Sequence, residues 1–88
     1  MKTKKTKLTK AQWQSVVDAM DSAYWSSEAM MVTDLMRGFK TVSKKYGLGE
    51  WWDGQVFGEA SRLARLGRHQ VNDVNVESLN AALERDRS

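Results

Sequence analysis

An apolar stripe at helical spacing constrains this chain more than any other feature. Five apolar residues follow one another at steps of three and four, the spacing of one face of an α-helix. They are Val32, Leu35, Phe39, Val42 and Tyr46. Lys44 and Lys45 fall in the last turn, where cations suit the helix dipole, and Gly47 follows as a stop. The pattern therefore predicts a helix over Glu28–Tyr46.

The stretch before this helix predicts another one. Thr9 is suited to be its N-cap, and Gln12, three residues later, completes a capping box. Apolar residues then recur at helical steps, namely Trp13, Val16, Val17, Met20 and Tyr24. Ser26 and Ser27 interrupt the pattern, and serine hydroxyls compete for backbone hydrogen bonds. We expect the chain to break there rather than to continue as one long helix.

Two further helices are expected after Gly47. The first opens at Glu50, ends at Gly67 and turns one apolar face inward. That face comprises Trp52, Val56, Ala60, Leu63 and Ala64, with Phe57 beside it. The last helix is short, with Asn75 as its N-cap, and the tail Arg85–Ser88 is expected to fray. No segment alternates like a strand, so the sequence predicts an all-α fold, a small bundle or orthogonal array of three to four helices.

The length of 88 residues leaves room for one domain. The chain has no cysteine, which excludes disulfides and thiolate zinc sites, and a lone histidine cannot build a histidine-rich metal site. The fold must therefore rest on its apolar core, on a partner or on its target. Gly54 and Gly58 weaken the third helix, and we expect them to permit close approach of another backbone.

Positive charge is concentrated at the N-terminus. Five lysines and no acid lie in the first ten residues, whereas the chain from Ala11 onward has nine Lys and Arg against eleven Asp and Glu. We interpret residues 1–8 as a flexible basic arm and residues 9–88 as a single helical domain. A uniformly basic nucleic-acid-binding domain would have a different distribution of charge.

The sequence contains no recognisable catalytic constellation. His69, which lies among arginines, is the one histidine available as a base, and no serine has a nucleophile-elbow sequence around it. Asp18 and Asp21 are better interpreted as a solvated acidic face than as a cation site. Glu59 and Arg62 suit a surface ion pair. We therefore expect no enzymatic activity, no cofactor and no metal.

Basic residues are the candidates for contact with nucleic acid or an acidic surface. They are Lys4, Lys5 and Lys7 of the arm, Arg37, Lys40 and Lys44 on one predicted helix, and Arg62, Arg65 and Arg68 on the next. If the two helical stripes meet on one side, they and the arm could contact several phosphates. The alternative is that they are the water-facing sides of amphipathic helices, and the nearly neutral body favours it.

Two tryptophans do not fit the apolar stripes. Trp25 and Trp51 fall outside them, and Met30 lies close to Trp25 in the sequence. An indole left exposed on a small domain often anchors a protein interface, so these three are the candidate protein-binding residues. Core filling is the alternative, and a domain of this size favours it for most large side chains.

These observations lead to two hypotheses about function. The first is a non-enzymatic helical protein that binds a protein or nucleoprotein complex and inhibits it by covering its surface. In size and character the chain is similar to small helical proteins of phages and mobile elements that act in this way, although the similarity covers no specific residues. The second is a nucleic-acid-binding accessory or regulatory factor. The heptad-like spacing permits a homodimer, and the absence of a long apolar run favours the cytoplasm without a membrane partner.

Overall fold

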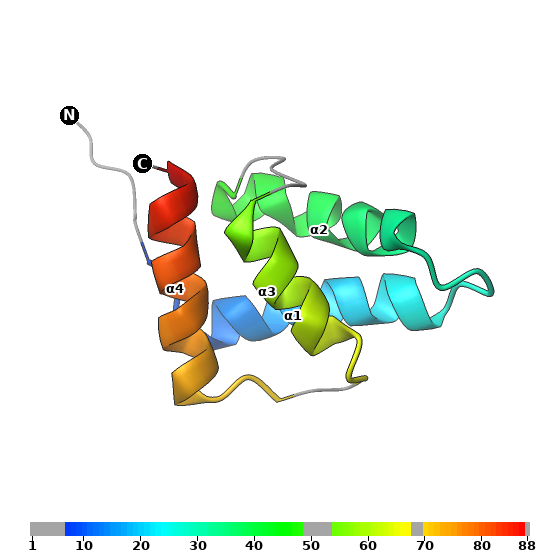
Figure 1. Cartoon of the computed structure of the whole chain (residues 1–88), viewed down its shortest axis with the longest axis horizontal. Helices are drawn as coiled ribbons and strands as arrows, with labels where there is room; N and C mark the ends of the chain where they lie inside the picture. The colour runs from blue at the N-terminus through cyan, green and yellow to red at the C-terminus, as the bar shows by residue number, and fades with distance from the viewer. Residues whose placement is uncertain (1–6, 49–53, 68–69, 88) are drawn as a thin grey trace.

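The computed structural model describes residues 7–48, 54–67 and 70–87, which fold into four α-helices. They are α1 (Lys10–Trp25), α2 (Val32–Tyr46), α3 (Gln55–Ala64) and α4 (Asp73–Arg87). α1 and α2 lie side by side, α3 packs across them, and α4 stands across the end that holds the start of α1 (Figure 1). The described residues contain no strand, and the predicted all-α fold is confirmed. None of these four helices is long and apolar enough to cross a membrane.

The predicted start of α1 and the break after it are both confirmed. The Gln12 backbone N–H donates to Thr9 Oγ1 over 3.2 Å, and the Thr9 N–H donates to Gln12 Oε1 over 2.8 Å. α2 begins at Val32 and not at Glu28 as predicted. The reason is Asp34, whose carboxylate accepts a 2.9 Å hydrogen bond from the Met31 N–H and so caps the helix there.

A glycine sets the distance between α1 and α2. A Cβ atom at Gly38 would lie 2.6 Å from the Ala19 carbonyl oxygen and 2.7 Å from the Met20 Cα. No side chain fits there, so the two backbones meet directly. The expectation that Gly58 permits such an approach is wrong, because a Cβ at Gly58 would meet nothing within 4 Å.

The core gathers the apolar faces of all four helices. Trp13, Phe39 and Leu79 are completely buried, and the Phe39 and Phe57 rings meet edge to face with their centroids 5.4 Å apart. The predicted inner residues of α1 and α3 that the structure describes are buried or packed against this core. On α2, Leu35 is buried as predicted, whereas Val32 is exposed.

The structure describes only one of the two predicted ends of α3. Residues 49–53 lie outside the described part of the chain, and with them the predicted start at Glu50 and the predicted core residue Trp52. At the other end α3 stops at Ala64, three residues before Gly67. Gly67 has a φ of +77°, in the left-handed region that glycine adopts without strain.

α4 is longer than predicted at both ends. It begins at Asp73, because Asn72 and not Asn75 is its cap: the Asn75 N–H donates to Asn72 Oδ1 over 2.8 Å. The expectation of a fraying tail from Arg85 is wrong up to Arg87. The Asp86 carboxylate accepts hydrogen bonds from the Gln55 and Val56 N–H groups over 2.8 and 2.9 Å, which caps the start of α3.

The body of the domain begins one residue earlier than predicted. Leu8, assigned to the arm from the sequence, is buried in the core. Its N–H donates to Asn80 Oδ1 over 2.9 Å, and its carbonyl accepts from Asn80 Nδ2 over 3.1 Å. Lys7 is exposed, and residues 1–6 lie outside the described part of the chain.

Candidate functional site

Trp25 is held in place and yet remains exposed. Its indole Nε1 donates a 3.0 Å hydrogen bond to the Ala64 carbonyl at the end of α3, and its ring meets Tyr24 edge to face at 5.3 Å. Even so, 47% of its surface is accessible. An indole with its one donor satisfied has only apolar surface left to offer, which is the property of an interface anchor.

The turn between α1 and α2 exposes three more large apolar side chains. Met30, Met31 and Val32 are between 40% and 56% accessible. Met30 also has a φ of +51°, a left-handed conformation that costs a residue with a Cβ about 1 kcal/mol or more. Together with Trp25, these residues form what we call the apolar tip.

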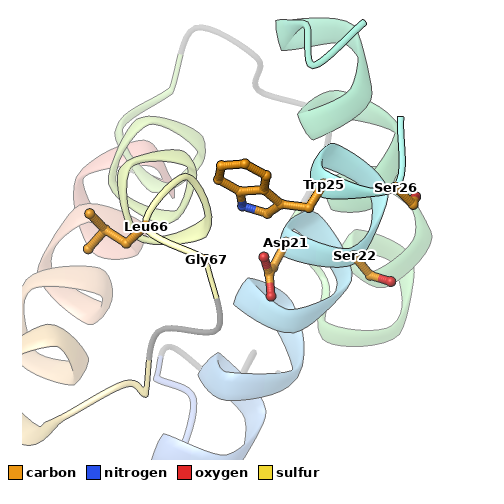
Figure 2. A pocket seen from close by; sticks show the side chains of 6 residues that line it. All are labelled: Asp21, Ser22, Trp25, Ser26, Leu66 and Gly67. Carbon is orange, nitrogen blue, oxygen red and sulfur yellow. The ribbon is translucent and has the colours of Figure 1, made fainter. Parts of the chain in front are cut away.

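A groove opens beside the tip, between the end of α1 and the segment after α3 (Figure 2). It has a volume of about 640 Å³. Its lining comprises Asp21, Ser22, Trp25, Ser26, Leu66 and Gly67. Leu66 is 62% accessible. The glycine leaves the indole uncovered, since even a Cβ at Gly67 would come within 3.6 Å of its nitrogen.

A charged pair fixes the base of the tip. The carboxylate of Asp34, almost wholly buried, accepts hydrogen bonds from the Met31 N–H over 2.9 Å and from Arg37 Nη1 over 3.0 Å. The Met31 N–H is the main cause that lowers the pKa of Asp34 below its ordinary value, and the Ser27 hydroxyl and Arg37 add to it. Asp34 therefore stays ionised at neutral pH and holds the start of α2 against the turn.

The predicted basic stripes lie on separate helices. On α2, Lys40 and Lys44 are exposed, while Arg37 is paired with Asp34. On α3, Arg62 pairs with Glu59 over 2.6 Å, which confirms that predicted surface pair, and Arg65 is exposed. α2 and α3 make far less contact with each other than α1 and α2 do, and no described interaction joins the two stripes.

Several predicted residues fall outside the described ranges. They are Lys4, Lys5, Trp51, Arg68 and His69. The described ranges include no group of three histidine, aspartate or glutamate side chains placed to hold a metal ion. Asp18 accepts a 3.0 Å hydrogen bond from Gln14 Nε2 on the surface of α1.

Sequence reasoning missed part of the tip and of the groove. Val32 belongs to the predicted apolar stripe of the second helix, yet Val32 and the preceding Met31 are exposed because the helix begins only at Val32. Asp34, three residues after Met31, is the capping signal that could have corrected this start. Leu66 carried no signal, since it lies in no stripe and its exposure depends on where α3 ends.

Comparison with known proteins found no match to any family model, curated protein or solved structure.

Proposed function

We propose that this chain is a non-enzymatic binding protein that attaches to another protein through its apolar tip and the adjoining groove, and that it inhibits its partner by covering part of its surface. The observation that carries the proposal is the exposure of Trp25 although its indole is fixed by Ala64. A small domain needs its large apolar side chains for the core, so the exposure of Trp25 calls for a role outside the core.

The energetics favour a partner over solvent at this end of the molecule. Full burial of one large apolar side chain stabilises a complex by about 1.5–3 kcal/mol. Trp25, Met30, Met31 and Leu66 are all exposed and so can be buried by a partner. Methionine adapts its shape to irregular surfaces, and the fixed indole loses little conformational freedom on binding. The tip and groove therefore combine a rigid anchor with adaptable surroundings.

Charged side chains border the apolar residues. Glu28 and Arg37 are exposed on either side of the turn, and Arg65 directly follows the residue that holds Trp25. A polar rim around an apolar centre is the usual anatomy of a protein interface. In this proposal the charges set orientation and association rate, while the apolar centre supplies most of the affinity.

Affinity capture from a lysate of the native host, with and without nuclease, tests the partner class. We expect a protein that is retained after nuclease treatment and lost when Met31→Lys is used as bait. Val74→Lys is the matched control, because Val74 is also an exposed apolar residue, 70% accessible, but lies at the start of α4. Binding that depends equally on both positions, or that nuclease abolishes, contradicts the proposal.

Nucleic-acid binding is the second candidate function. The exposed Lys40 and Lys44 on α2, together with Arg65 and the lysines of the arm, support it. A titration against duplex DNA at several salt concentrations separates the two candidates. Specific binding of phosphates would weaken steeply with salt and be lost on charge reversal of Arg62 and Arg65, whereas an adhesive arm alone would lose binding on deletion of residues 1–6.

A further inference from the structure

Charge is unevenly distributed over the four helices of the domain. α2 has four cations and one acid, Asp34, whereas α1, α3 and α4 each have at least as many acids as cations. Asp34 is almost wholly buried and accepts a hydrogen bond from Arg37, so the exposed charges of α2 are all positive. The acids of α4 do not offset them, because α4 packs against α1 and α3 and not against α2 (Figure 1).

The exposed cations of α2 lie on one side of the helix. At 3.6 residues per turn they fall within about 140° of its circumference and extend over about 12 Å of its length. With Thr41 between them they form what we call the basic face, which comprises Arg37, Lys40, Thr41, Lys44 and Lys45. The described ranges include no ion pair of Lys40 or Lys44. Such a row of like charges attracts a polyanion.

A groove between α1 and α2 adjoins the basic face. It has a volume of about 420 Å³, and Gly38 lies in its lining at the place where the two backbones meet. The described lining contains a guanidinium, three hydroxyls and no carboxylate. These polar groups belong to Arg37, Ser22, Ser26 and Thr41. Arginine, serine and threonine side chains are the usual partners of phosphate oxygens, so the groove has the composition of a phosphate contact.

Arg37 is held in position over this groove. Its Nη1 donates to Asp34 over 3.0 Å, and its Nη2 lies 3.5 Å from the Ala23 carbonyl oxygen on the opposite wall. These two contacts use two of the five N–H donors of a guanidinium, so the others can bind an anion. Because Asp34 already fixes the guanidinium, an anion that binds there costs little further conformational freedom.

We propose that the basic face and the adjoining groove bind the phosphate backbone of a nucleic-acid duplex. The cations extend over about 12 Å, which matches about three or four phosphates spaced by about 3.4 Å along one strand. A single strand fits less well, because proteins that bind one stack its bases on aromatic side chains, and the basic face has none. Contacts to phosphates carry no sequence information, so we expect binding that is independent of sequence.

This inference rests on nucleic-acid binding, the second candidate function, and assigns it to α2 instead of α3. On α3, Arg62 already pairs with Glu59, and the helix has one cation for one acid. Charge reversal at Arg62 and Arg65 therefore tests a contact through α3, whereas the variants below test the contact through α2. The binding role of the apolar tip is not required.

Titration of the full chain against a short labelled DNA duplex at several salt concentrations tests the placement. Lys40→Gln with Lys44→Gln removes two cations from the basic face, and Arg62→Gln with Arg65→Gln is the control with the same change in net charge. We expect the slope of log affinity against log salt to become shallower by about 2 for the lysine pair and to stay at the wild-type value for the arginine pair. A shallower slope for the arginine pair alone would leave nucleic-acid binding standing and overturn its placement on α2.

Competition with unlabelled polymers tests the partner class. We expect a duplex of unrelated sequence to displace the probe as well as the probe's own sequence does. Poly-glutamate and an oligothymidine strand, at the same concentration of charge, should displace it less. Equal displacement by poly-glutamate would assign the basic face to an acidic protein, and equal displacement by the single strand would exclude the duplex as its partner. Either result overturns the proposal, and so does binding that only deletion of residues 1–6 alters, or no binding by the wild-type chain.

Discussion

The two helix pairs of this domain are held together by opposite means. α1 and α2 meet where Gly38 has no side chain, so their contact is steric and backbone to backbone. α3 and α4 are joined by the Asp86 carboxylate, which α4 extends to the first N–H groups of α3. The α1–α2 contact, which we call the steric joint, requires that residue 38 has no side chain. The α3–α4 contact, which we call the polar joint, requires the Asp86 carboxylate.

The surroundings of α4 and the turn between α1 and α2 also differ in polarity. Around α4, polar side chains hydrogen-bond backbone groups that flank other helices: Asn80 binds Leu8 before α1, and Arg87 donates to the Gly47 carbonyl after α2 over 2.8 Å. At the α1–α2 turn, large apolar side chains face water. The comparison teaches that the polar contacts around α4 serve folding, whereas the exposed apolar side chains of the tip make no such contribution and are the basis of the binding role that we propose.

The largest expected effect is at the steric joint. Gly38→Ala places a Cβ 2.6 Å from a backbone oxygen, so α1 and α2 must move apart, and we expect the free energy of unfolding to fall by about 3 kcal/mol in urea denaturation. Gly58→Ala is the control, because its Cβ enters open space in a helix, and a gain of up to about 1 kcal/mol is expected. Similar losses for both variants would show that the joint is not steric.

The next largest effect is expected at the contact between Leu8 and Asn80 of α4. Asn80→Ala leaves the buried Trp13 Nε1 and both polar groups of Leu8 without their partner. We expect a loss of about 2 kcal/mol. Asn80→Asp keeps an acceptor for the two N–H groups but loses the donor to Leu8, so a smaller loss should follow. An unchanged unfolding midpoint for Asn80→Ala would contradict the role of this side chain.

A smaller loss is expected at the polar joint. Asp86→Ala removes the cap of α3 and should lower the free energy of unfolding by about 1–2 kcal/mol. Asp73→Ala is the control, since its ion pair with Lys10 is exposed and worth less than about 1 kcal/mol. If Asp73→Ala costs more than Asp86→Ala, the cap does not hold the joint.

The smallest expected loss of stability concerns Asp34 and appears only at acidic pH. Because the pKa of Asp34 is lowered in the folded state, its contribution is complete above the unfolded-state pKa of about 4 and is lost as the pH falls below it. Urea denaturation between pH 7 and pH 2 should show this loss in the wild-type chain. Asp34→Asn should flatten that part of the curve, and an unaltered curve would exclude Asp34 as its source.

Periodicity made the helices predictable, whereas contacts between distant residues did not follow from it. The stripe from Leu35 to Tyr46 and the capping box at Thr9 are local signals, and the structure agrees with both. Asp86 and Asn80 act across 30 and 72 residues of sequence, so no local pattern announces them. The exposure of Trp25 agrees with its place outside every stripe, whereas the exposure of Leu66 could not be predicted because it depends on how α3 ends against α1.

Amide hydrogen exchange of the chain bound to its captured partner tests the central claim most directly. We predict that binding slows exchange at Met30, Met31 and Val32 of the apolar tip and at Leu66 and Gly67 of the groove, while the exposed face of α4 exchanges at its free rate. Slowed exchange confined to α4, with the tip unchanged, would contradict the assignment of the exposed apolar side chains to a partner.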